Sequence, residues 1–230
     1  ARCWGGDGKR LSGNVAEAIA GRLCDVPPDA LALLRWLALS GGEWSVRTVE
    51  ALATLALVPI HAALDRALEA RVLVFTGGRY RFRHELVRQA LLDLVPPHHR
   101  LKMHREIAAQ LADMDAVPAN VARHWLEGGR PSDAMPWLLA AARDAARLAA
   151  FSDALLHLAP VLAIQPGHAE ALRLRADTLD AMGDPGAMAA YRQAAQAAGE
   201  PDSHNLLAKA ALARKGAPVD LDRALEEGRI

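Results

Sequence analysis

The chain has 230 residues, no formal net charge at neutral pH, 52% apolar residues and only 4% aromatic residues. This length can bury one large or two small globular cores, and the balanced charge excludes a global attraction to nucleic acid or to an anionic membrane. The scarcity of aromatic residues favours closely packed helices over a β-sandwich or barrel.

Cys3 and Cys24 are too few for a disulfide framework, and their spacing fits no zinc module. Their presence predicts a reduced, cytoplasmic protein. No apolar run approaches the roughly 18 residues of a membrane span, and no signal peptide is visible, so no membrane partner is expected. The chain begins with Ala1 rather than Met, which indicates a processed start or a piece of a longer protein.

Residues 1–12 are rich in glycine and lack periodicity, which predicts a linker. The run Gly5-Gly6-Asp7-Gly8-Lys9-Arg10 does not form a phosphate-binding loop. That motif needs four residues between its glycines and a Ser or Thr after the lysine, where this chain has Arg10.

Residues 13–95 are predicted to form a first domain. Its expected helices cover about 14–24, a stretch between Pro27-Pro28 and Gly41-Gly42, 45–55 and 59–70. A β-hairpin is predicted next, because a β-branched and aromatic run at 72–75 is joined by a glycine turn to an alternating run at 79–82. Helices, a hairpin and a further helix in this order are typical of a winged-helix domain.

Residues 96–230 are predicted to form a second, wholly helical domain, so the chain as a whole is expected to be mainly α. Helices are expected at about 97–114, 118–126, 132–149, 152–164, 168–182, 185–198, 202–215 and 219–228. Ala142 and Ala176 lie 34 residues apart, as do helix ends at Ala149 and Gly183. This period predicts an α-solenoid of tetratricopeptide-like helix pairs, in which small residues allow paired helices to approach closely.

Stacks of this kind expose their first helices along a concave face that binds partners. The residues predicted to project from that face are charged: Arg143, Arg147, Arg173, Asp177 and Asp180. A partner groove and a merely solvated surface are equally compatible with this pattern.

A winged helix suggests DNA binding, but the helix in the recognition position, 59–71, is poorly suited to reading bases. Base readout needs several Arg, Lys, Asn or Gln side chains, whereas here Asp65 and Glu69 offset Arg66 and Arg71. The predicted wing could contact phosphates through Arg79, Arg81 and Arg83. A solvated strand or contacts to another protein domain are favoured over DNA.

No catalytic residues and no metal ligands are predicted. His84-Glu85 begins like a zincin helix, but Arg88 stands where the second histidine is required. His98, His99 and His104 are expected to point from different faces of a surface helix. No nucleophile elbow is present, so this chain alone is not expected to be an enzyme.

His84 lies where the predicted hairpin meets the next helix. A lone histidine at such a junction is usually a cap or a packing residue, yet the free N–H groups of a helix N-terminus also suit anions. Arg81, Arg83 and Arg88 lie close in sequence. Together with His84 they could form a phosphate-sensing corner, if another domain brings a nucleotide to it.

The segment Phe82-Arg83-His84 with Leu86 and Arg88, followed by Pro96-Pro97 and the helical repeat, resembles the region after the nucleotide-binding module of bacterial STAND signalling ATPases. Large LuxR-type and SARP-type transcriptional regulators belong to this family. The resemblance covers about residues 13–200. In the family, a Met-His-Asp motif places its histidine near the β-phosphate of ADP.

In this chain the similar sequence is Arg83-His84-Glu85, in which Arg stands in place of Met and Glu in place of Asp. The resemblance implies that His84, with Arg83 and Arg81, senses a nucleotide held by an upstream ATPase domain. ATP or ADP with magnesium would then be the cofactor of a parent protein, and no cofactor is expected in this chain, which lacks the phosphate-binding loop.

The leading hypothesis is a non-catalytic regulatory and protein-interaction region of a STAND-type signal-transducing transcriptional regulator. Its winged helix would control the nucleotide state, its repeats would sense a protein or small-molecule inducer, and DNA would be reached through the parent protein. The alternative is a DNA-binding winged-helix transcription factor with a helical effector domain. A third hypothesis is a free-standing scaffold.

Overall fold

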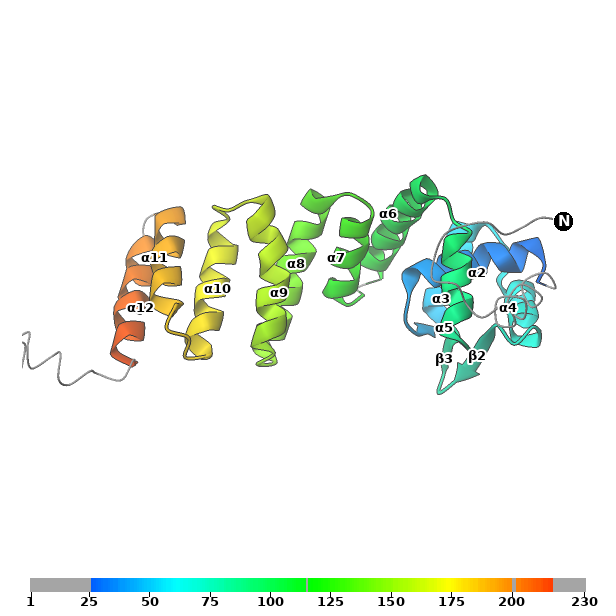
Figure 1. The fold of residues 1–230 in the computed structure, drawn as a ribbon, viewed down its shortest axis with the longest axis horizontal. Helices are drawn as coiled ribbons and strands as arrows, with labels where there is room; N and C mark the ends of the chain where they lie inside the picture. The colour runs from blue at the N-terminus through cyan, green and yellow to red at the C-terminus, as the bar shows by residue number, and fades with distance from the viewer. Residues whose placement is uncertain (1–25, 115, 200–201, 217–230) are drawn as a thin grey trace, which may run out of the picture. The chain divides into compact units, whose positions relative to one another are not determined.

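The computed structural model describes residues 26–114, 116–199 and 202–216. The predicted linker at 1–12 and the predicted helices at 14–24 and 219–228 lie outside this part of the chain. The described part is mainly helical with one small antiparallel sheet, as the sequence predicts (Figure 1).

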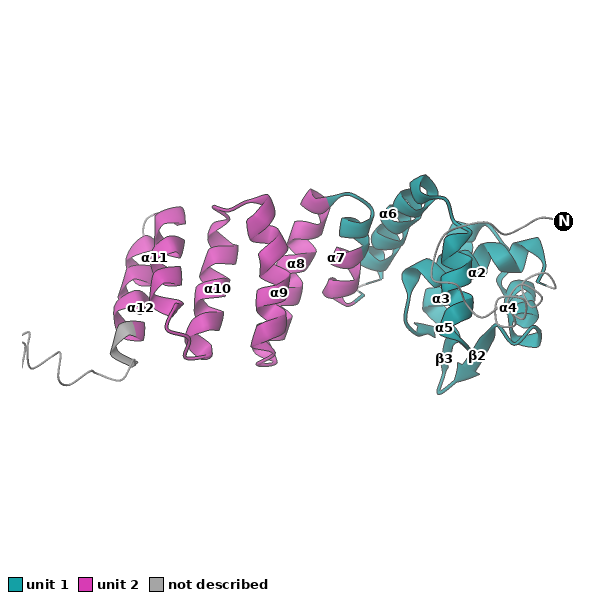
Figure 2. Cartoon of the chain, viewed as in Figure 1, with its two compact units in different colours: residues 1–116, 124–130 teal, residues 117–123, 131–230 magenta. Residues whose placement is uncertain are grey.

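The chain divides into two compact units (Figure 2). The first comprises the residues up to Ala116 together with His124–Arg130, and the second comprises Val117–Arg123 and the residues from Pro131 onward. The last four of the ten residues of α7 (Pro118–Glu127) therefore belong to the first unit.

The first unit contains helices α2 (Pro28–Ser40), α3 (Val46–Ala56), α4 (Ile60–Glu69), α5 (Glu85–Asp93) and α6 (Pro97–Asp113), and strands β1 (Trp44–Ser45), β2 (Leu73–Thr76) and β3 (Arg79–Phe82). From the sequence, α6 was predicted to belong to the second domain. It belongs to the first unit because Ile107 of α6 is fully buried in the core that α2 and α3 build.

The sheet has the strand order β1-β3-β2, and both pairs are antiparallel. The β2–β3 hairpin was predicted, and Gly77 and Gly78 at its turn have φ of 60° and 76°. Positive φ at both central residues is what a two-residue hairpin turn of this hand requires. Strand β1 was not predicted; it pairs Trp44 with Tyr80.

The core of the first unit is centred on α2, which packs against α3, α4, α5 and α6. The Trp44 and Phe82 rings meet edge-on with centroids 5.4 Å apart, and the Trp44 indole N–H donates to the Ser40 hydroxyl at 2.7 Å. Ser45 caps α3, since its hydroxyl accepts from the Thr48 amide at 3.2 Å. These bonds fix the loop that carries β1 beside the hairpin.

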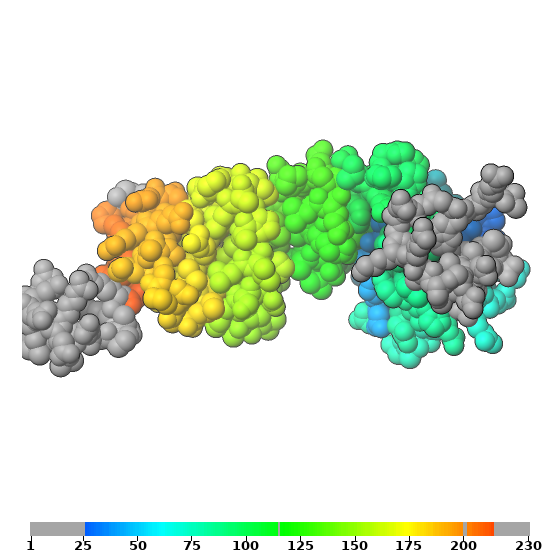
Figure 3. Space-filling view, in the orientation of Figure 1, coloured from blue at the N-terminus to red at the C-terminus, as the bar shows by residue number. Residues whose placement is uncertain are grey.

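The second unit contains α8 (Pro131–Arg147), α9 (Phe151–Ile164), α10 (Ala169–Ala181), α11 (Ala187–Ala197) and α12 (Asp202–Gly216). Each helix packs against the next along the chain, and α10 also contacts α8. The space-filling view shows their side chains adjoining along one face (Figure 3).

Positions matched in the sequence share burial or backbone conformation in the structure. Ala142 and Ala176 are fully buried, and Ala149 and Gly183 both have left-handed backbone, with φ of 57° and 67°. Pairs of residues 33 apart on α9 and α11 are also buried: Ala154 with Ala187, Leu158 with Tyr191, and Val161 with Ala194.

Among the described residues, no single helix is both long and apolar enough to cross a membrane. Helices α3 and α4 reach that length only together, and they are bent by 110° at the break between them.

Candidate partner-binding groove

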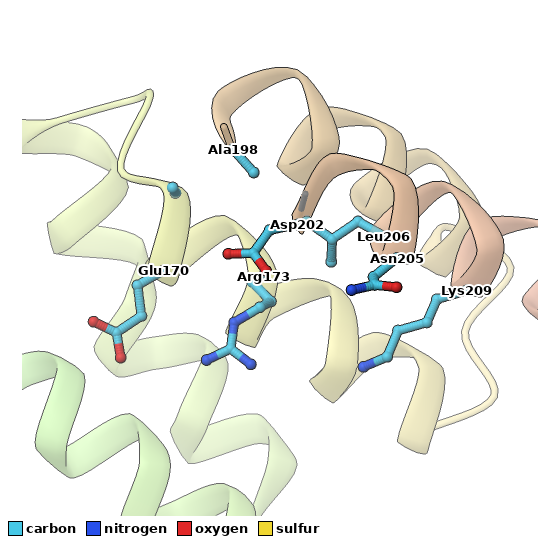
Figure 4. Close-up of a pocket in the computed structure, with 8 residues that line it drawn as sticks. Glu170, Arg173, Ala198, Asp202, Asn205, Leu206 and Lys209 are labelled. Carbon is cyan, nitrogen blue, oxygen red and sulfur yellow. The ribbon is translucent and has the colours of Figure 1, made fainter. Parts of the chain in front are cut away.

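Two pockets lie along alternate helices of the second unit. The α10–α12 pocket has a volume of about 530 Å³, and its polar lining residues are Glu170, Arg173, Asp202, Asn205 and Lys209 (Figure 4). The α8–α10 pocket also has a volume of about 530 Å³, and its charged lining residues are Arg143, Asp144 and Arg147. Helix α10 contributes to both pockets.

In the α10–α12 pocket, Arg173 projects from α10 while Asn205 and Lys209 project from α12 (Figure 4). Asn205 and Lys209 are four residues apart, so one helix face carries both. Leu206 is buried between them and provides an apolar contact. Arg173 is exposed and forms no ion pair with any residue in the described part of the chain.

Lys209 is held by a network behind this pocket. Its ammonium lies 2.6 Å from Asp177 Oδ1 and 5.5 Å from the centroid of the Tyr191 ring. The Tyr191 hydroxyl donates to Asp177 at 2.9 Å and to Asp180 at 3.3 Å. Burial of the phenol, together with these acceptors, raises the pKa of Tyr191 well above its usual value.

An ion pair joins the two pockets. Arg143 Nε of α8 donates to Glu170 Oε1 of α10 at 3.0 Å. Arg147 pairs with Asp144 on its own helix. Both ion pairs are partly exposed to water and are therefore weak. An incoming ligand can compete with their carboxylates for the two arginines.

The structure brings the predicted groove residues together on α8 and α10. Arg143 and Arg147 line one pocket and Arg173 lines the other, whereas Asp177 and Asp180 accept hydrogen bonds from Tyr191. The contribution of α12 was not predicted from the sequence. The four-residue spacing of Asn205 and Lys209 on a predicted helix was the available signal.

The hairpin corner is exposed. His84 is the N-cap of α5, with its side chain in solvent and no side-chain cap hydrogen bond. Arg79, Arg81 and Arg83 are also exposed, and Arg81 Nε lies 3.8 Å from Glu43 Oε1. Arg79 and Arg81 are two apart on β3 and so face the same side of the strand. Together with Arg83 and the start of α5, they are exposed to a ligand.

Arg88 does not belong to this corner. Its guanidinium Nε donates to Glu85 Oε1 at 2.7 Å, and its Nη1 donates to the Ala38 carbonyl at 3.0 Å. The hydrogen bond from Arg88 lowers the pKa of Glu85. Arg88 therefore ties α5 to α2.

Helix α4 has the mixed surface expected from the sequence. His61, Asp65, Arg66 and Glu69 are exposed, and Arg66 pairs with Glu69 at 2.9 Å. The carboxylate of Glu69 beside Arg66 opposes contact with the anionic edge of a duplex.

The histidines of α6 differ from the expectation of a surface helix. His98 and His99 are exposed, but the side chain of His104 is only 13% exposed. Its ring packs against that of His124, with ring centroids 5.1 Å apart.

No protein-family model matches the chain, and no significant match was found among curated proteins or solved structures. The resemblance to STAND regulators therefore stays a prediction from the sequence.

Proposed function

We propose that the chain is a non-catalytic regulatory and protein-interaction region whose second unit holds a segment of a partner protein along α8, α10 and α12. The supporting observation is the α10–α12 pocket, in which the unpaired guanidinium of Arg173 faces Asn205 and Lys209. The α8–α10 pocket continues the same row of helices and gives an extended ligand a second place to bind.

The lining groups favour a peptide that carries a carboxylate. A guanidinium binds a carboxylate through two parallel hydrogen bonds, and Arg173 is available for such a bond. The Asn205 amide offers a donor and an acceptor, which match the C=O and N–H of a peptide backbone. The buried Leu206 adds an apolar contact for a neighbouring side chain. A volume of about 530 Å³ is typical of ligand sites.

In the parent protein, we propose that the first unit acts as the winged helix of a bacterial, cytoplasmic STAND-type transcriptional regulator and that the second unit is its tetratricopeptide-like sensor. The exposure of His84, Arg81 and Arg83 at the start of α5 supports this role, because an anion can reach them. An upstream ATPase domain would supply ADP or ATP with magnesium. Binding of a partner or inducer by the second unit would then favour one nucleotide state.

Nuclear magnetic resonance titration of the isotope-labelled chain tests the groove. The probes are two pools of blocked octapeptides, one rich in Asp and Glu and one with the isosteric Asn and Gln. We expect the acidic pool alone to shift amide signals of α10 and α12. Arg173→Ala should abolish these shifts, whereas Arg192→Ala, at an exposed arginine of α11, should preserve them. Equal responses to the two pools, or shifts confined to other helices, would contradict the proposal.

A further inference from the structure

His104, His124 and Glu127 form a compact cluster within the first unit. His104 belongs to α6, while His124 and Glu127 lie three residues apart on α7 and so share one helix face. His104 Nδ1 lies 2.8 Å from His124 Nδ1 and 3.2 Å from Glu127 Oε2. One potential ligand atom from each of the three lies within 4.8 Å of the other two.

We infer that this cluster binds a divalent transition-metal ion, with zinc as the expected ion. Two imidazoles and one carboxylate are ligands that zinc accepts, and three protein ligands leave a fourth position for water or a partner's ligand. The inference concerns the first unit and is independent of the peptide groove.

The separations between the three ligand atoms fit a tetrahedral zinc site after a small adjustment. Zinc–ligand bonds of about 2.0–2.1 Å in a tetrahedron place neighbouring ligand atoms about 3.3 Å apart. The 3.2 Å between His104 and Glu127 already matches, and the 2.8 Å between the two imidazoles must open by about half an ångström. Two imidazole nitrogens at hydrogen-bond distance share one proton. Metal binding would move that proton to Nε2 of the same ring, so that both imidazoles stay neutral and both Nδ1 lone pairs face one ion.

The close approach of α6 and α7 is built into the sequence at Gly128. A Cβ atom at Gly128 would lie 2.9 Å from Arg105 Cγ and 3.3 Å from the Arg105 amide nitrogen. The Gly128 carbonyl also accepts a hydrogen bond from Arg105 Nε at 2.6 Å. His104 and His124 each lie within four residues of this contact, so it fixes the separation of their rings.

Burial distinguishes this cluster from surface histidines. His124 is completely buried and the His104 side chain is 13% exposed, whereas the Glu127 side chain is 43% exposed. The two imidazoles are therefore held in place, and the open side at Glu127 provides a path for the ion. His98 and His99 are adjacent on the same helix, but both are exposed.

The test is a titration of the metal-stripped chain with Co²⁺, followed by competition with Zn²⁺. We expect one equivalent of Co²⁺ to give the visible absorption band of a low-coordinate site, and zinc to remove it. Glu127→Gln and His104→Gln should each weaken Co²⁺ binding by about tenfold or more. A double variant, His98→Ala with His99→Ala, is the matched control and should bind as the parent does.

Circular dichroism of each variant checks that the fold is retained, and Glu127→Gln changes a partly exposed side chain without loss of volume. Zinc should also raise the melting temperature of the parent chain by several degrees. The inference is wrong if the parent chain gives no visible band and no zinc-dependent melting shift. It is equally wrong if the band survives Glu127→Gln and His104→Gln but disappears when His98 and His99 are replaced.

Discussion

The hydroxyl of Tyr191 donates a hydrogen bond of 2.9 Å to Asp177, although Tyr191 lies on α11 and Asp177 lies on α10. Asp177 also accepts a hydrogen bond from the ammonium group of Lys209 on α12. One carboxylate therefore links the three successive helices α10, α11 and α12. The groove side chain Lys209 is thus positioned by a buried phenol from a neighbouring helix.

Replacement of Tyr191 by Phe should lower the free energy of unfolding by about 1–2 kcal/mol, because a hydrogen bond to a charged acceptor is lost. Equilibrium urea unfolding of both proteins measures this difference. The same substitution should weaken binding of the acidic peptide pool, since Lys209 loses part of its support. A variant with parental stability would show that the Tyr191–Asp177 bond contributes nothing.

Stability should also depend on alkaline pH. The pKa of Tyr191 is higher in the folded chain than in the unfolded chain, where a phenol titrates near pH 10. Its contribution is therefore fully present below about pH 10 and is lost as the pH rises toward the folded pKa. Tyr80→Phe leaves Tyr191 as the one remaining tyrosine. In that variant the absorbance of tyrosinate should rise only well above pH 10. This rise should coincide with unfolding of the chain.

Ala149→Gly should stabilise the second unit by about 1 kcal/mol. The reason is that the left-handed backbone conformation has a higher free energy for alanine than for glycine. Ala149 is exposed with φ of 57°, so no packing is lost. Gly183→Ala is the reciprocal variant. Its Cβ would meet no atom within 4 Å, so a similar destabilisation would come from the backbone alone. Urea midpoints that move in the same direction for both variants would refute the equivalence of the two positions.

Gly128→Ala should destabilise the first unit by about 1–3 kcal/mol, because the added methyl group overlaps Arg105. It should also weaken Co²⁺ binding by separating His104 from His124. Thermal unfolding and the cobalt titration measure the two effects. Gly167→Ala is the control, since its Cβ would meet nothing within 4 Å and both measurements should stay at parental values.

His84→Ala in the complete parent protein should accelerate ADP dissociation, because His84 is proposed to contact the nucleotide from the exposed start of α5. Release of a fluorescent ADP analogue after mixing with excess ATP measures the rate. His61→Ala, an exposed histidine of α4 in the same unit, should leave the rate unchanged. An unaltered rate in His84→Ala would exclude this histidine as the nucleotide sensor.

The isolated chain should not bind duplex DNA strongly even at low salt, because the exposed face of α4 pairs Arg66 with Glu69. A gel shift with random-sequence duplex at several salt concentrations tests this. Retention that weakens steeply with salt, and that is lost on replacing Arg79 and Arg83 by Ala, would instead favour the DNA-binding alternative.

Much of the helical architecture could be predicted from local signals. A proline in the first turn and a glycine after the last turn mark α2, and the predicted 97–114 and 152–164 agree closely with α6 and α9. The hairpin was predictable because Gly77-Gly78 separates two β-rich runs. These signals act within a few residues, so one sequence is enough to detect them.

Features that depend on distant contacts were missed. Strand β1 has two residues, too few to show alternation, and it exists because Trp44 pairs with Tyr80 far along the chain. His104 was expected on a solvated face, since nothing local indicates that His124 of α7 covers it. The role of Arg88 was likewise set by a carbonyl of α2 that lies fifty positions earlier in the chain.

The shared left-handed backbone at Ala149 and Gly183 also bears on how such a chain can lengthen. The segment 150–183 starts and finishes at equivalent points of the helical row. An in-frame duplication of that segment would therefore rejoin the chain without new turn geometry, and each added unit would contact only its neighbours. Gene-level duplication or deletion of 34 codons is thus a direct evolutionary route to a longer or shorter binding surface.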